Sequence, residues 1–125
     1  MVTVSFNSHE KAVDSLLDLD RMFCGFEQHD QFELGLSIAD GPSICMLRNG
    51  EHAFVMYMRF PGDSGFVSIG ASMSKEQVQY TLGNGQVDEY PRSWCIPTEQ
   101  CFQALMYFFV NDGARPEGIA WHESH

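Results

Sequence analysis

Basic residues are scarce in this sequence: seven lysines and arginines stand against 17 aspartates and glutamates, a formal net charge of −10. Proteins that bind nucleic acid or an anionic membrane surface present a basic face. The composition therefore argues against either as a direct partner. An acidic surface favours fast association with a basic partner, although solubility alone would account for the same balance.

The sequence also lacks a cysteine framework and a long apolar run. Its four cysteines form no C-x-x-C pair, and the N-terminal MVTVSFNSHEK has no basic region followed by an apolar stretch. These features argue against a disulfide scaffold, a secretory signal and a membrane-spanning helix. They predict a reduced, cytoplasmic protein, and a length of 125 residues fits one domain over residues 1–125.

Signals for metal binding or catalysis are equally sparse. The five histidines follow no zinc-binding spacing, and they are His9, His29, His52, His122 and His125. No glycine pattern indicates a nucleotide site. We therefore expect no metal and no cofactor.

Cys101 is the best candidate for a nucleophile. It falls in the first turn of an expected helix, where the helix dipole can lower the pKa of a thiol. However, no histidine base lies near it in the sequence, and it precedes Leu105 by one turn on the apolar side. We expect Cys101 to be buried and inert, and the protein not to be an enzyme.

Hydrophobic periodicity predicts the secondary structure. We expect Asn7 or Ser8 to cap the first helix, because Glu10 suits a capping box on Asn7. Asn49-Gly50 lies between two apolar runs and predicts a tight hairpin. Residues 51–60 are apolar on both faces, which indicates a central strand covered at least partly on both sides. The expected elements are a strand at 2–6, a helix ending at Gly25, strands at 31–38, 43–49, 51–60, 66–72 and 78–82, a polar irregular segment at 88–93, a helix at 98–111 and a strand at 118–121.

This order, β-α-β-β-β-β-β-α-β, predicts the α+β class. We expect a curved, mainly antiparallel sheet of about six to seven strands with two helices packed on one face. Gly113 should end the second helix, and Pro116 should prevent it from continuing. We expect Arg115 to contact the carbonyls at the C-terminus of that helix and Trp121 to belong to the scaffold.

The C-terminal segment SWCIPTEQCFQALMYFFVNDGARPEGIAWHE resembles the C-terminal signature of immunity protein family one from bacterial polymorphic toxin systems. The shared features are Ile96-Pro97, the aromatic pair Phe108-Phe109, the segment 113–116 and the apolar strand 119–121. Upstream, VMYM, GFVSIGAS and EYP resemble the central strands of the family and its acidic-aromatic segment. The likeness covers roughly the last 75 residues.

The resemblance implies an inhibitor that binds the toxin domain of a cognate effector. Family members are paired with nucleic-acid-targeting toxins, including cytidine deaminases, and the acidity of this chain suits a basic toxin of that kind. The resemblance supplies no catalytic residues. The alternative is an acidic secretion chaperone, a class that also contains small α+β proteins but usually forms dimers.

Acids on loops can reach the basic cleft of a nucleic-acid enzyme, whereas acids on a helix packed against the sheet reach it less easily. We therefore expect Glu51, Asp63, Asp88 and Glu89 to contact the toxin, with Tyr90 as an aromatic anchor. The expected complex is one-to-one, with the inhibitor as a monomer.

Overall fold

The computed structural model describes residues 2–123. Neither α-helix in this part of the chain is long and apolar enough to cross a membrane. The elements are β1 (Val2–Phe6), β2 (His9–Val13), α1 (Leu16–Phe26), β3 (Gln31–Ile38), β4 (Ser43–Asn49), β5 (His52–Met58), β6 (Phe66–Ser68), β7 (Gln77–Thr81), β8 (Val87–Pro91), the 3-10 helix η1 (Arg92–Trp94), α2 (Thr98–Val110) and β9 (Trp121–Glu123).

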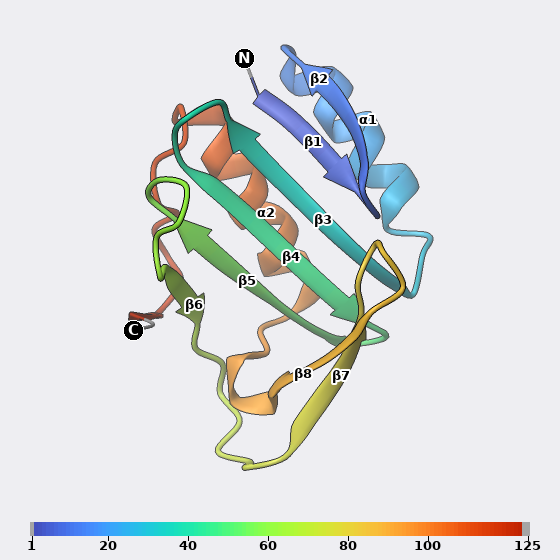
Figure 1. The fold of residues 1–125 in the computed structure, drawn as a ribbon, viewed down its shortest axis with the longest axis vertical. Helices are drawn as coiled ribbons and strands as arrows, with labels where there is room; N and C mark the ends of the chain where they lie inside the picture. Colours follow the sequence, from blue (N-terminus) through green and yellow to red (C-terminus); the bar gives the residue numbers. More distant parts are fainter. Residues whose placement is uncertain (1, 124–125) are drawn as a thin grey trace.

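Seven strands form one open antiparallel sheet in the order β2-β1-β3-β4-β5-β6-β9. Both helices lie behind this sheet in Figure 1, and α2 packs against β3, β4 and β5. The predicted α+β class, antiparallel sheet and pair of helices on one face are therefore confirmed. The element order differs, because β2 precedes α1 and β7 and β8 form a separate two-stranded sheet.

The first helix begins later than predicted. Asn7 and Ser8 have positive φ angles of 48° and 72° and form the tight turn between β1 and β2, so neither caps a helix. Glu10 accordingly lies in β2. The true N-cap is Ser15, whose hydroxyl accepts a hydrogen bond from the Asp18 backbone N–H at 3.1 Å. The helix also continues through Gly25 to Phe26.

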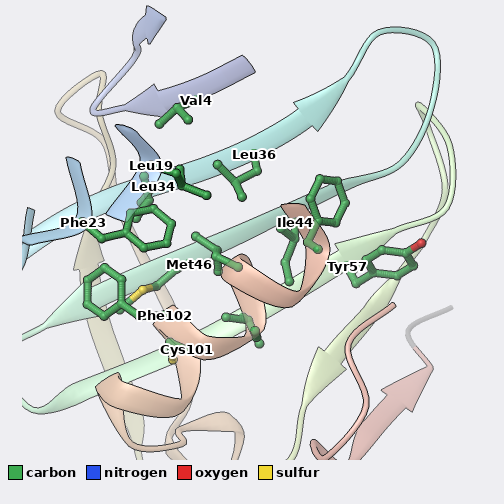
Figure 2. Close-up of a cluster of buried hydrophobic side chains, with 14 of the residues drawn as sticks. Val4, Leu19, Phe23, Leu34, Leu36, Ile44, Met46, Tyr57, Cys101 and Phe102 are labelled. Atoms are coloured by element: carbon green, nitrogen blue, oxygen red, sulfur yellow. The ribbon is translucent and has the colours of Figure 1, made fainter. Parts of the chain in front are cut away.

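The main core lies between the sheet and the two helices. Leu34 and Leu36 of β3 and Met46 of β4 face this layer, where Phe102 of α2 meets Phe23 of α1 (Figure 2). The rings of Phe23 and Phe102 have centroids 5.3 Å apart. Alternating residues of β3 and one face of α2 supply these core side chains.

A second, smaller core lies on the opposite face of the sheet. The β7–β8 hairpin covers the ends of β3 and β4 there, and Val78 and Tyr80 pack against Leu47 and Phe54. This confirms that β5 is covered on both sides, since Val55 faces the helices. The prediction of an irregular segment at residues 88–93 was wrong, because β8 pairs with β7 over its whole length.

The C-terminal segment is scaffold, but its contacts differ from the prediction. α2 ends at Val110 with Asn111 as its C-cap, earlier than predicted. Gly113 follows with φ +88°, its N–H donates to the Phe108 carbonyl at 2.8 Å, and a Cβ there would lie 2.5 Å from Pro42. Arg115 places its guanidinium over the Phe66 ring, 4.5 Å from the centroid, and not at the carbonyls of α2. Trp121 opens β9 and is only half-buried; its indole Nε1–H donates to the Pro116 carbonyl at 2.9 Å.

Candidate partner-binding surface

Glu51 lies in the predicted hairpin, at the turn between β4 and β5. Asn49 pairs with His52, so the turn consists of Gly50 and Glu51, and Gly50 takes the positive φ of 63° that the turn requires. Glu51 is exposed at this turn. The structure therefore presents its carboxylate to solvent, as a partner-binding role requires.

The β8 strand divides Asp88, Glu89 and Tyr90 between two faces. Opposed residues of an antiparallel pair share a face, so Asp88 lies with buried Tyr80 on the inner face of the hairpin. Glu89 lies on the outer face beside Gln79, whose amide donates to its carboxylate at 3.3 Å. Only Glu89 of the three points away from the sheet.

Tyr90 is half-buried and belongs to the second core. Its ring stacks on Trp94 with centroids 5.5 Å apart, and it lies 5.2 Å from the ring of Phe54. Its hydroxyl donates to Asp88 at 3.2 Å. Burial, with the Asp88 carboxylate as a second cause, raises the pKa of Tyr90 above its ordinary value. Tyr90 therefore stabilises the hairpin and presents only part of its surface to a partner.

Asp63 differs from the other residues predicted to bind a partner, because it is buried and paired with a basic side chain. It lies in the loop between β5 and β6 but is buried, and its carboxylate accepts hydrogen bonds from the Arg59 guanidinium at 2.9 and 3.0 Å. Hydrogen bonds from the Arg59 side chain and backbone hold the pKa of Asp63 well below its usual range. Its geometry is that of a loop-stabilising ion pair.

Glu51 and Glu89 lie at the same end of the sheet, because the β4–β5 turn is tied to the hairpin. The Asn49 side-chain amide donates to the Gln79 carbonyl at 2.8 Å, and Gln79 is the cross-strand partner of Glu89. The tip of the hairpin is fixed as well: Gly83 N–H donates to the Glu33 carboxylate at 3.0 Å. The hairpin is thus anchored at two points on the sheet.

Arg48 ties the same turn to the end of α1. Its guanidinium donates to the carbonyls of Gly50 at 2.9 Å, Glu27 at 3.1 Å and His29 at 3.2 Å. The Gly50 N–H completes the junction by donating to the Asp30 carbonyl at 2.7 Å. These bonds place Glu27, Asp30 and Glu51 around one junction. Glu89 lies beside Gln79, to which Asn49 is bonded, and Glu99 lines the same groove as Glu27 and Arg48. We call these five acids the acidic end.

A groove of about 700 Å³ between the two helices opens at the acidic end. Asp20, Cys24 and Glu27 line it from α1, at the i, i+4 and i+7 positions of one helix face. Glu99 and Gln103 line it from α2. The sequence analysis excluded acids on helices from the expected toxin-binding surface. Their spacing nevertheless predicts that Asp20 and Glu27 share one face of α1. The pairing with α2 could not be predicted, because it depends on the tertiary fold.

Two of the cysteines have thiol pKa values that are raised by burial. Cys101 is fully buried, and burial raises the pKa of its thiol, so it is a neutral core group as predicted. Burial and the Glu33 carboxylate likewise raise the pKa of Cys45 to about 12. Within residues 2–123 the histidine, cysteine and carboxylate side chains form no group that could hold a metal ion. His125 lies outside the described residues.

These features define a small acidic α+β protein whose buried thiols belong to its scaffold and five of whose 17 acidic residues form the acidic end. The family model for Immunity protein Imm1 matches residues 9–123. The chain therefore belongs to the Imm1 immunity protein family, and membership implies that it binds a cognate toxin. None of the curated proteins searched matches the chain.

Proposed function

We propose that this immunity protein neutralises a nucleic-acid-targeting toxin of a polymorphic toxin system, such as a cytidine deaminase or a nuclease. It acts in the cytoplasm as a stoichiometric inhibitor and not as an enzyme. The family match over residues 9–123 is the observation that carries this proposal. It also favours an inhibitor over the secretion chaperone that the composition would allow.

The net charge of −10 supports a toxin with a basic surface. An enzyme that acts on nucleic acid holds phosphates in a basic cleft, and an acidic inhibitor can cover such a cleft. Long-range attraction between the two surfaces accelerates association, while contacts within the interface slow dissociation. The monomeric inhibitor binds one toxin domain.

We propose that the acidic end forms the contact surface. Glu51 and Glu89 are its exposed outer acids, and Asp88 and Tyr90 support the hairpin from its inner side. Asp63 was included in the predicted surface, but its burial and its pairing with Arg59 assign it to the scaffold. The proposed interface therefore comprises Glu51 and Glu89 directly, and Asp88 and Tyr90 as the hairpin's supports.

Binding kinetics against the toxin domain encoded by the neighbouring gene test this proposal. We expect a one-to-one complex whose association slows as salt rises from roughly 50 to 200 mM, because screening weakens the attraction between exposed charges. Replacing Glu51 and Glu89 by lysine should slow association at low salt by about tenfold or more.

The matched control replaces Asp14 and Glu117 by lysine. Both are exposed, and the change in formal charge is the same. Equal effects of the two double variants would exclude the acidic end as the specific surface. A stable dimer of this chain that leaves the toxin fully active would instead support a secretion chaperone.

A further inference from the structure

We propose that the groove between α1 and α2 is the docking site for a long cationic side chain, an arginine or a lysine, of the toxin. This inference rests on the proposed function and specifies the chemistry that the surface recognises. The groove shares Glu27 and Glu99 with the acidic end, and Arg48, which also lines it, donates to the Gly50 carbonyl next to Glu51.

The shape and lining of the groove match such a side chain. The rings of Phe23 and Phe102 lie at its base, and the carboxylates of Asp20, Glu27 and Glu99 border it. Arginine and lysine have an apolar stem and a charged tip. The aromatic base can therefore accommodate the stem while the carboxylates bind the tip.

The charge balance of the groove favours a cation. Three carboxylates face one guanidinium, that of Arg48. Among residues 2–123, neither the Arg59–Asp63 pair nor the Arg92–Glu76 pair involves a groove carboxylate, and Asp20, Glu27 and Glu99 have no basic partner in a salt bridge there. Glu99 lies in the first turn of α2, where the helix dipole offsets part of its charge, so Asp20 and Glu27 contribute most of the attraction.

Arg48 shows how this end of the groove binds a guanidinium. Its guanidinium carbon lies 5.9 Å from the centroid of the Phe32 ring, while Nη1 donates to the carbonyls of Glu27 and His29. A guanidinium held between an aromatic ring and the end of α1 is thus already part of the fold. Because the Arg48 bonds go to backbone carbonyls, the carboxylates remain available to an incoming side chain.

The first test uses a defined probe, the blocked tripeptide acetyl-Gly-Arg-Gly-amide, in an NMR titration of the full-length protein. We expect saturable shifts of backbone amides along the facing sides of α1 and α2, and no such shifts with acetyl-Gly-Glu-Gly-amide. Asp20→Asn combined with Glu27→Gln should weaken peptide binding by about fivefold or more. Asp14→Asn combined with Glu117→Gln removes the same charge elsewhere and should leave the affinity within about twofold. Equal losses in both double variants, or shifts without saturation at the groove, would overturn the proposal.

The second test measures dissociation of the toxin domain encoded by the neighbouring gene. Asp20→Asn with Glu27→Gln should accelerate dissociation by about tenfold or more, because it removes contacts inside the interface and not only the long-range attraction. If the wild type binds the toxin and this double variant dissociates no faster, the groove inference is wrong while the proposed function stands. If the wild type binds no toxin but the arginine peptide saturates the groove, the proposed function fails and the cation site remains.

Discussion

Replacing Arg48 by methionine should loosen the junction of α1, the α1–β3 loop and the β4–β5 turn. The substitution keeps an apolar stem of similar length beside Phe32 but removes every guanidinium donor. Three hydrogen bonds, at 2.9, 3.1 and 3.2 Å, are lost together. The change therefore tests whether one side chain holds the acidic end in place.

The magnitude follows from those three bonds. Each contributes roughly 0.5–1.5 kcal/mol net, and the bonds to Glu27 and His29 are exposed, so water can satisfy the carbonyls after substitution. The lower half of the range applies, and the free energy of unfolding should fall by about 2 kcal/mol. The lost interaction of the guanidinium with the Phe32 ring adds at most about 0.5 kcal/mol.

Urea unfolding followed by circular dichroism measures this change, with Arg21→Met as the control. Arg21 is an exposed arginine on α1, and its loss should alter stability by less than about 0.5 kcal/mol. Hydrogen exchange should also accelerate in the Arg48 variant at Gly50, whose N–H bonds to the Asp30 carbonyl. If Arg48→Met and Arg21→Met have equal stability, Arg48 does not hold this junction together.

Three further results are expected. Trp121→Ala should lower the free energy of unfolding by about 2–3 kcal/mol, less than for a fully buried tryptophan, because Trp121 is half-buried at the edge strand β9; an unchanged melting temperature would contradict its scaffold role. Cys101→Ala should cost about 1–2 kcal/mol by leaving a small cavity, and a folded variant that no longer neutralises the toxin would show that the thiol has another role. The depressed pKa of Asp63 contributes stability that is present at neutral pH and is lost as pH falls below about 4 towards the folded-state pKa. Asp63→Asn should therefore flatten the fall in melting temperature between about pH 6 and pH 2.5, and equal slopes in the two proteins would remove Asp63 as a cause.

Local patterns predicted most of the sheet and the second helix. The alternation of β3, the hairpin signal at Asn49-Gly50 and the apolar period of α2 each describe short-range structure. The fold follows them, although the hairpin turn lies one residue later, at Gly50 and Glu51. The prediction that Asn7 or Ser8 caps the first helix was wrong because asparagine and serine occur both at helix N-caps and in tight turns. Both residue types cap helices, and asparagine in particular tolerates the positive φ of a hairpin turn. The β1–β2 turn used Asn7 and Ser8, and Ser15 supplied the cap.

The hairpin and the groove were missed for a different reason. The sequence of residues 88–91 is polar and shows no strand pattern by itself. These residues form a strand because they pair with β7 and because Tyr90 contacts Phe54 and Trp94. The groove is lined by Glu27 and Glu99, which are far apart in the sequence and are brought together only when the two helices pack. The burial of Asp63 could not be predicted from the sequence either, because a charged residue in a glycine-rich loop is ordinarily exposed.

Titration of toxin activity with this protein tests the central claim most directly. The assay follows the action of the purified toxin domain from the neighbouring gene on its nucleic-acid substrate while the immunity protein is added. We predict complete inhibition at one equivalent of wild-type protein, and a requirement for a large excess of the Glu51→Lys, Glu89→Lys variant. Full toxin activity in the presence of several equivalents of folded wild-type protein would contradict the account.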